Sequence, residues 1–157
     1  MIVCFTGHRA LGTTDEHRRL QELLAAQVKQ LTDVGATVFR TGGALGFDTE
    51  AAIAVLSQKK KTPQIRLELL LPCRDQCARW SQRDRELYEK ILAHADAYTY
   101  LSEHYYHGVM QARNRALVNG ADVCVAFLRT GEKGGTAYTV SYAEKSGVPV
   151  INLFKDL

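Results

Sequence analysis

The residues best suited to bind an anion lie in the segment Thr41-Gly42-Gly43-Ala44-Leu45-Gly46-Phe47-Asp48. An apolar run precedes this segment and a helical pattern follows it, so three glycines lie where a strand turns into a helix. Glycine lacks a Cβ and adopts positive φ, which lets a ligand approach the backbone. The free N–H groups at the start of a helix suit a phosphate. The spacing matches neither G-x-G-x-x-G nor G-x-x-x-x-G-K-[ST], and a tight turn that binds nothing is an equal alternative at this point.

Two further segments carry glycines after predicted strands. Thr6-Gly7-His8-Arg9 follows the first strand, and Lys133-Gly134-Gly135-Thr136 follows the fifth. Ligands of doubly wound sheets bind outside the carboxyl ends of the strands, so these segments are expected to converge with the glycine loop. Gly43 and Gly135 are expected to lie near each other around one anion.

Cationic and aromatic side chains accompany these loops. Guanidinium groups make planar, bidentate contacts with phosphates, and four arginines are candidates: Arg9, Arg74, Arg79 and Arg113. Three residues could supply a stacking face for a base, although ordinary packing explains each of them taken alone: Trp80, Tyr105 and Tyr106. His8 is interpreted as a hydrogen-bonding residue of its loop rather than a catalyst.

The carboxylates allow two interpretations. Asp48 lies near the start of the second helix, where it either braces the loop or accepts a hydrogen bond from a hydroxyl, for example of a ribose. The brace is slightly favoured. Glu132 is a candidate general acid or base on the loop before Gly134.

A metal site is not expected. Cys73-x-x-x-Cys77 and His104-x-x-His107 supply residue types that zinc accepts, but the histidine spacing is one residue short of the usual finger pattern. We therefore predict no zinc in the purified protein.

Alternating apolar runs and helical patterns predict the elements that must position these residues. Strands are expected near residues 2–6, 36–41, 65–71, 97–101, 122–128 and 149–153, and helices over 14–34, 48–60, 81–94, 109–119 and 136–146. Continuous apolar runs such as 122–128 are typical of strands buried on both faces, hence of a parallel sheet between helix layers. The pattern predicts one α/β domain over residues 1–157, with a Rossmann-like, doubly wound, mainly parallel sheet.

The composition is that of an ordinary globular domain. Of the 157 residues, 46% are hydrophobic and 24% charged, and the formal net charge of +3 gives only weak support to a nucleic-acid partner. No apolar run reaches transmembrane length, so no membrane partner is expected. Cys4 and Cys124 fall in predicted buried strands, and a reduced, cytoplasmic protein is the simplest expectation.

Four motifs, in order, resemble the SLOG superfamily, which includes the DNA-processing protein A family and the Lonely Guy phosphoribohydrolases. The motifs are Thr6-Gly7-His8-Arg9, Gly42 to Asp48, Arg113-Asn114-Arg115 and Gly134-Gly135-Thr136-Ala137. Their order and spacing are most similar to the YpsA-like branch of short, single-domain bacterial proteins, and the resemblance spans nearly the whole chain. It implies a Rossmann-like fold that holds a nucleotide, or a related ligand such as ADP-ribose, at the glycine loops.

The resemblance, together with the loop positions above, defines a set of expected ligand-binding residues. They are Gly7, His8, Arg9, Gly42, Gly43, Ala44, Gly46, Asp48, Trp80, Arg113, Gly134, Gly135 and Thr136. The phosphoribohydrolases carry a glutamate in a P-G-G-x-G-T-x-x-E motif, whereas here Thr136 is followed by no acid through Val140. No catalytic residue is therefore assigned.

Three functions follow as hypotheses. The first is binding or sensing of a small nucleotide-like ligand. The second is a nucleotide N-glycosidase or phosphoribohydrolase that uses a shifted acid such as Glu132. The third is binding of single-stranded nucleic acid. A homo-oligomer is left open.

Overall fold

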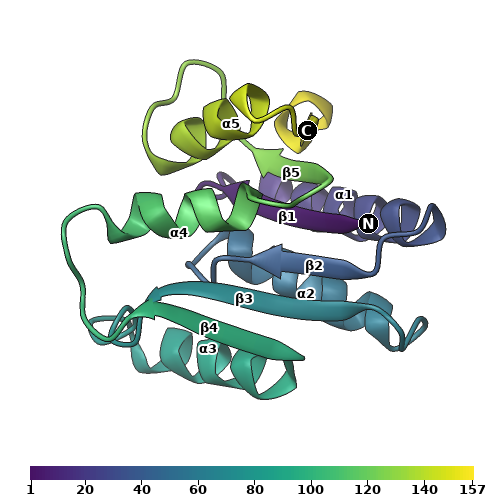
Figure 1. Cartoon of the computed structure of the whole chain (residues 1–157). Coiled ribbons are helices and arrows are strands. Elements are labelled where there is room, and N and C mark those ends of the chain that lie inside the picture. The colour runs from purple at the N-terminus through teal and green to yellow at the C-terminus, as the bar shows by residue number, and fades with distance from the viewer.

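The computed structural model describes residues 1–157, in which strands and helices alternate along the chain (Figure 1). The strands are β1 (Ile2–Gly7), β2 (Val38–Thr41), β3 (Arg66–Cys73), β4 (Ala97–Ser102), β5 (Val123–Phe127) and β6 (Val150–Asn152). The helices are α1 (Thr14–Asp33), α2 (Phe47–Lys59), α3 (Gln82–His94), α4 (Val109–Val118) and α5 (Gly135–Lys145), followed by a short 3-10 helix, η1 (Leu153–Asp156). Every predicted strand and helix is present, and only η1 was not predicted.

The six strands form one sheet in the order β4-β3-β2-β1-β5-β6, and every neighbouring pair is parallel. From β1 to β4 the chain adds strands on one side of β1. It then returns through α4 to place β5 on the other side of β1. The Rossmann-like fold class is confirmed, and the switch point of the sheet lies between the carboxyl ends of β1 and β5.

Helices cover both faces of the sheet. The first three helices pack on one face and α4 and α5 pack on the other, as Figure 1 shows for α4 in front of the sheet and α1 and α2 behind it. Helical spacing predicts an apolar stripe on α1 formed by Leu20, Leu23, Leu24, Val28 and Leu31; Leu23 is half-buried and the other four are buried. A capping box between Thr13 and Glu16 starts this helix, as their spacing predicts.

None of the helices combines the length and the hydropathy that a membrane span requires.

Candidate functional site

The loop after β1 packs directly on the glycine loop after β2. Gly46 is the N-cap of α2 with φ of 85°, and a Cβ there would collide with the carbonyl oxygen of Arg9. A Cβ on Gly7 would collide with the ring of Phe47, whose N–H donates to the carbonyl of His8 at 3.1 Å. The predicted convergence of these two loops is therefore observed, and it depends on two positions that have no side chain.

Two buried side chains hold the glycine loop. Arg113 of α4 is 4% exposed; its Nη1 donates to the carbonyl of Gly42, and its Nε donates to Oδ1 of Asn114 at 2.8 Å. Asp48 is 6% exposed and accepts a hydrogen bond from the N–H of Ala44 at 3.2 Å. Asp48 thus acts as the loop brace favoured from the sequence. The Arg113 guanidinium, expected at a phosphate, instead supports the loop from within the protein.

The environment of Asp48 perturbs its titration. Burial raises the pKa of Asp48 from 3.8 to about 6, while the charge of Arg113 and hydrogen bonds from the loop backbone oppose the shift. Burial in turn lowers the pKa of Arg113, and Asp48 opposes that shift. The loop therefore rests on a buried pair of opposite charges.

This raised pKa makes the stability of the fold depend on pH. Between about pH 4 and 7 the folded state binds more protons at Asp48 than the unfolded chain does, so the contribution of Asp48 to stability falls as pH rises. A tenfold change in proton affinity corresponds to about 1.4 kcal/mol, so the stability of Asp48→Asn relative to the wild type should increase by up to about 3 kcal/mol from pH 4 to pH 7. Urea unfolding of both proteins at several pH values measures this difference.

Comparing the wild type with Asp48→Asn cancels the effect of His8 on the pH dependence of stability. Burial lowers the pKa of His8, which stabilises the fold as pH rises through the same range, but both proteins share this contribution. The attraction between Asp48 and Arg113 already contributes to the folded-state pKa of Asp48, so it adds no separate pH dependence to the stability difference. A stability difference that is flat from pH 4 to 7 would contradict a buried, titrating Asp48.

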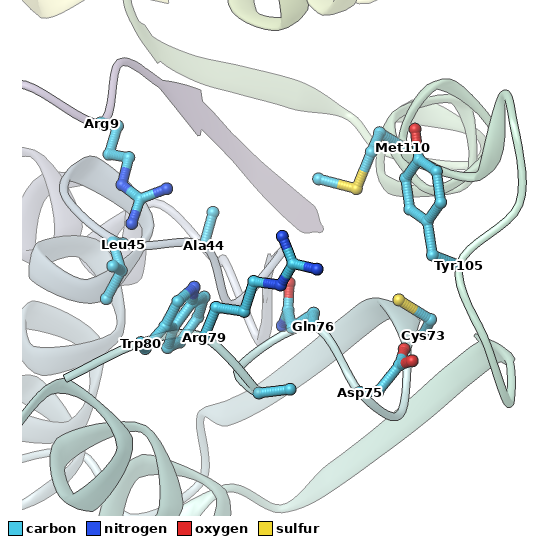
Figure 2. A pocket seen from close by; sticks show the side chains of 11 residues that line it. Arg9, Ala44, Leu45, Cys73, Asp75, Gln76, Arg79, Trp80, Tyr105 and Met110 are labelled. Atoms are coloured by element: carbon cyan, nitrogen blue, oxygen red, sulfur yellow. The ribbon is translucent and has the colours of Figure 1, made fainter. Parts of the chain in front are cut away.

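A cavity of about 680 Å³ opens beside the glycine loop (Figure 2). Its wall includes Arg9 from the loop after β1, Leu45 from the glycine loop, Arg79 and Trp80 from the loop after β3, and Tyr105 from the loop after β4. Because all these loops follow carboxyl ends of parallel strands, the cavity lies at the edge where doubly wound folds bind ligands.

Two unpaired cations face this cavity. Arg9 and Arg79 are exposed, neither makes an ion pair, and Figure 2 shows both guanidinium groups pointing toward the space between the loops. Arg74 does not join them, because it pairs with Glu103 at 2.8 Å and lies 4.4 Å from the centre of the Tyr100 ring. Of the four candidate arginines, only two line the cavity.

The aromatic wall is partly fixed. Trp80 packs edge-on against Tyr88, with ring centres 5.2 Å apart. Gln76 donates to the hydroxyl of Tyr88 at 3.2 Å and so ties the loop after β3 to α3. Tyr105 lies across the cavity, as Figure 2 shows, while the neighbouring Tyr106 is not part of the wall.

Several wall residues were not among the expected site residues. They are Leu45, Cys73, Asp75, Gln76, Ala78, Arg79, Tyr105 and Met110, although Arg79 was considered for phosphate contacts and Tyr105 for stacking. Asp75 is the only acid in the wall. Their position in the sequence could have identified the wall residues between 72 and 80, because this segment directly follows a predicted strand, at the edge where such sheets bind ligands.

Gly43 has a packing role in addition to any contact with a ligand. Its φ is 70°, and a Cβ would collide with Leu71 of β3 and lie 3.4 Å from the side chains of Gln76 and Tyr88. A side chain at this position would therefore disturb the core before it met a ligand. Gly135 differs, because its nearest neighbour would be the Asn114 amide nitrogen at 3.7 Å.

The glycine loop at the start of α5, residues 133–136, lies at the switch point between β1 and β5 and does not line the cavity. Gly134 is the N-cap of α5, and Gly135 and Thr136 begin the helix. Arg113 and Asn114 connect this loop to the first one, since Arg113 bonds to Gly42 and to Asn114, which lies beside Gly135. The shared anion expected between Gly43 and Gly135 remains a prediction.

His8 lies at the same switch point, where it contacts the loop that carries Glu132. Its Nε2 accepts a hydrogen bond from the N–H of Arg129 at 2.9 Å, and a Glu132 carboxylate oxygen lies 2.9 Å from the same nitrogen. Burial lowers the pKa of His8, with Glu132 acting in the opposite direction. His8 thus connects two loops, as its sequence interpretation expects, and neither it nor Glu132 lines the cavity.

The cysteine and histidine pairs do not form a metal cluster. No three His, Cys, Asp or Glu side chains gather where they could hold an ion. Burial, followed by the neighbouring Asp75, raises the pKa of the Cys73 thiol to about 11, which keeps it protonated at neutral pH. His104 approaches Asp75 only to 3.7 Å.

Comparisons with known proteins agree with this architecture. The YpsA family model, described as the YspA SLOG family, matches residues 3–149. A UPF0398 protein of Bacillus pumilus is 27% identical and the alignment covers 99% of this chain and 88% of the relative. The SPbeta prophage-derived protein YoqJ of Bacillus subtilis is 30% identical over 82% of each chain.

A solved structure has the same fold. DNA processing protein A from Helicobacter pylori superimposes with a TM-score of 0.65 at 23% identity, covering 96% of this chain and 63% of that chain. The family model spans the three loop motifs that follow β1, β2 and β5, and nearly the full sheet. The chain therefore belongs to the YspA SLOG family.

Proposed function

We propose that the cavity binds a nucleotide or a nucleotide-derived phosphate ligand. The observation that carries this proposal is the pair of exposed, unpaired guanidinium groups of Arg9 and Arg79 on a cavity that also presents Trp80 and Tyr105. Cations without counter-charges favour an anionic ligand, and aromatic rings beside them favour one that carries a base.

The glycine loop supports a phosphate position. The backbone N–H groups of Leu45 and Gly46 make no hydrogen bond within the chain, and both lie at the start of α2. The positive end of the helix favours an anion there, and Arg9 lies on the same side of the cavity in Figure 2. Asp75, on the opposite side, can accept hydrogen bonds from a ribose hydroxyl or an amino group.

Binding or sensing is proposed rather than catalysis. Glu132, the acid considered for a glycosidase, contacts His8 and does not line the cavity. The fold alone supports no reaction.

Single-stranded nucleic acid is the second candidate. The similar structure of DNA processing protein A from Helicobacter pylori was described for its single-stranded DNA binding mode. Arginines interleaved with aromatic rings also suit single-stranded nucleic acid, because its bases stack on the rings and its phosphates pair with the arginines. The weak net charge of +3 favours the smaller ligand over a long strand.

Thermal unfolding in the presence of nucleoside mono- and diphosphates, ADP-ribose and a single-stranded oligonucleotide tests both candidates. A small ligand at about 100 times its dissociation constant should stabilise the protein by nearly 3 kcal/mol. Titration in increasing salt then separates the candidates, because contacts along a strand give a steep salt dependence. A response to the oligonucleotide alone would replace the first proposal by the second, and no response to any compound would contradict both.

A further inference from the structure

The outer edge of β4 is open and lacks the devices that usually protect an edge strand. β4 is the last strand of the sheet, so no other strand of the chain pairs with its outer edge, and Figure 1 shows α3 below and behind β4. Its sequence, Ala-Tyr-Thr-Tyr-Leu-Ser, contains no charged residue and no proline, and Tyr98 is 49% exposed. Natural proteins usually shorten, charge or cover such edges, because the free backbone groups pair readily with another strand.

The opposite edge of the sheet is protected. β6 has only three residues, Pro149 precedes it, and η1 begins directly after it. Only the β4 edge therefore offers several consecutive backbone groups. We propose that β4 pairs with β4 of a second copy of this chain and forms a two-fold symmetric dimer with a continuous sheet.

The sheet hydrogen bonds determine which groups of β4 point outward. The backbone N–H of Arg66 donates to the carbonyl of Thr37, on the β2 side of β3. Because successive residues of a strand direct their backbone N–H and C=O groups to opposite sides, those of Leu67 and Leu69 face β4. The β3–β4 register places these groups against Ala97 and Thr99. The N–H and C=O groups of Tyr98 and Tyr100 consequently face away from the sheet.

Two-fold symmetry then specifies one pairing. Identical edge strands related by a two-fold axis must run antiparallel. A register centred on Thr99 sets Tyr98 opposite the partner's Tyr100 and pairs all outward groups of both tyrosines. Thr99 lies on the axis opposite the partner's Thr99, as a pair without mutual hydrogen bonds, where Cα atoms are typically about 4.5 Å apart.

The charges at the two ends of β4 are compatible with this pairing. Lys59 and Asp96 form an ion pair at the start of β4, and Arg74 and Glu103 form another at its end. An antiparallel arrangement brings the first pair of one copy near the second pair of the other. Each pair is neutral, so the dimer places no uncompensated charge at the junction. The symmetric set of outward backbone groups and the neutrality of both ion pairs support a second copy as the occupant.

Sedimentation of the full chain and disulfide trapping test the proposal together. The wild-type protein should sediment with twice its 17.5 kDa mass at high concentration. Thr99→Cys should form an intermolecular disulfide under mild oxidation, because its distance from its symmetry mate suits a disulfide. Ala97→Cys is the matched control: it lies on the same face but opposite the partner's Leu101, so it should cross-link at least tenfold more slowly.

A third variant tests the direction of the backbone groups. Tyr98→Pro removes an outward N–H without breaking a bond to β3, so it should remain folded by circular dichroism and become monomeric. Equal cross-linking of Thr99→Cys and Ala97→Cys would overturn the register. A wild-type protein that stays monomeric, with neither cysteine variant cross-linking, would overturn the dimer. These results are independent of whether the cavity binds a nucleotide.

Discussion

Replacing Arg113 with methionine should lower the free energy of unfolding by about 3–5 kcal/mol at pH 7, the typical cost of removing one partner of a buried ion pair. The Asp48 carboxylate would lose its counter-charge, and the Gly42 carbonyl would lose a donor. Methionine fills a similar space, so the loss reports mainly on charge and hydrogen bonding. Urea unfolding monitored by circular dichroism measures it.

Arg115→Met is the matched control, two residues along the same helix. Arg115 donates to the exposed hydroxyl of Tyr138 rather than to a buried group, so the substitution should change stability by no more than about 0.5 kcal/mol. The double variant Arg113→Met with Asp48→Asn should recover part of the loss, because it leaves no unpaired buried charge. Equal effects of the Arg113 and Arg115 substitutions would contradict the proposed brace.

Removing both cavity arginines should nearly abolish binding of the nucleotide that the thermal screen identifies. A hydrogen bond to a charged group contributes about 1.5–3 kcal/mol, so Arg9→Ala and Arg79→Ala should each weaken binding by roughly 10- to 150-fold. The double variant should lose at least two orders of magnitude in affinity. Isothermal titration calorimetry measures each change.

The folded state should be unaffected by these substitutions, because both side chains are exposed and make no ion pair. Arg83→Ala is the control, since Arg83 is an exposed α3 arginine that does not line the cavity. Should the folded double variant bind the nucleotide as tightly as the wild type and the control, the ligand would lie elsewhere on the protein.

The stability predictions and the binding predictions concern two different sets of residues at the same edge of the sheet. Arg113 and Asp48 hold the glycine loop from inside the protein, whereas Arg9 and Arg79 face the cavity on the outside. Arg113→Met should therefore affect binding only through the shape of the loop, and the cavity arginines should affect binding with little change in stability.

Local sequence patterns determined the elements and their approximate ends. The spacing of five apolar residues predicted the stripe of α1, of which Leu23 alone is only half-buried. The continuous apolar run at 122–128 predicted β5 as a strand buried on both faces. These inferences succeed because periodicity depends only on neighbouring residues in the same element. The same alternation predicted that the loops expected to bind a ligand share one edge of the sheet.

The tertiary structure decided which candidate residues face that edge and which support it. Arg9, Arg79 and Arg113 are chemically identical side chains, yet two are exposed on the cavity and one is buried behind the glycine loop. Strand order and helix packing set these environments through contacts between segments distant in the chain. Residue type therefore predicted the chemistry available to this protein, whereas only the packed fold determined where each charge is exposed, paired or buried.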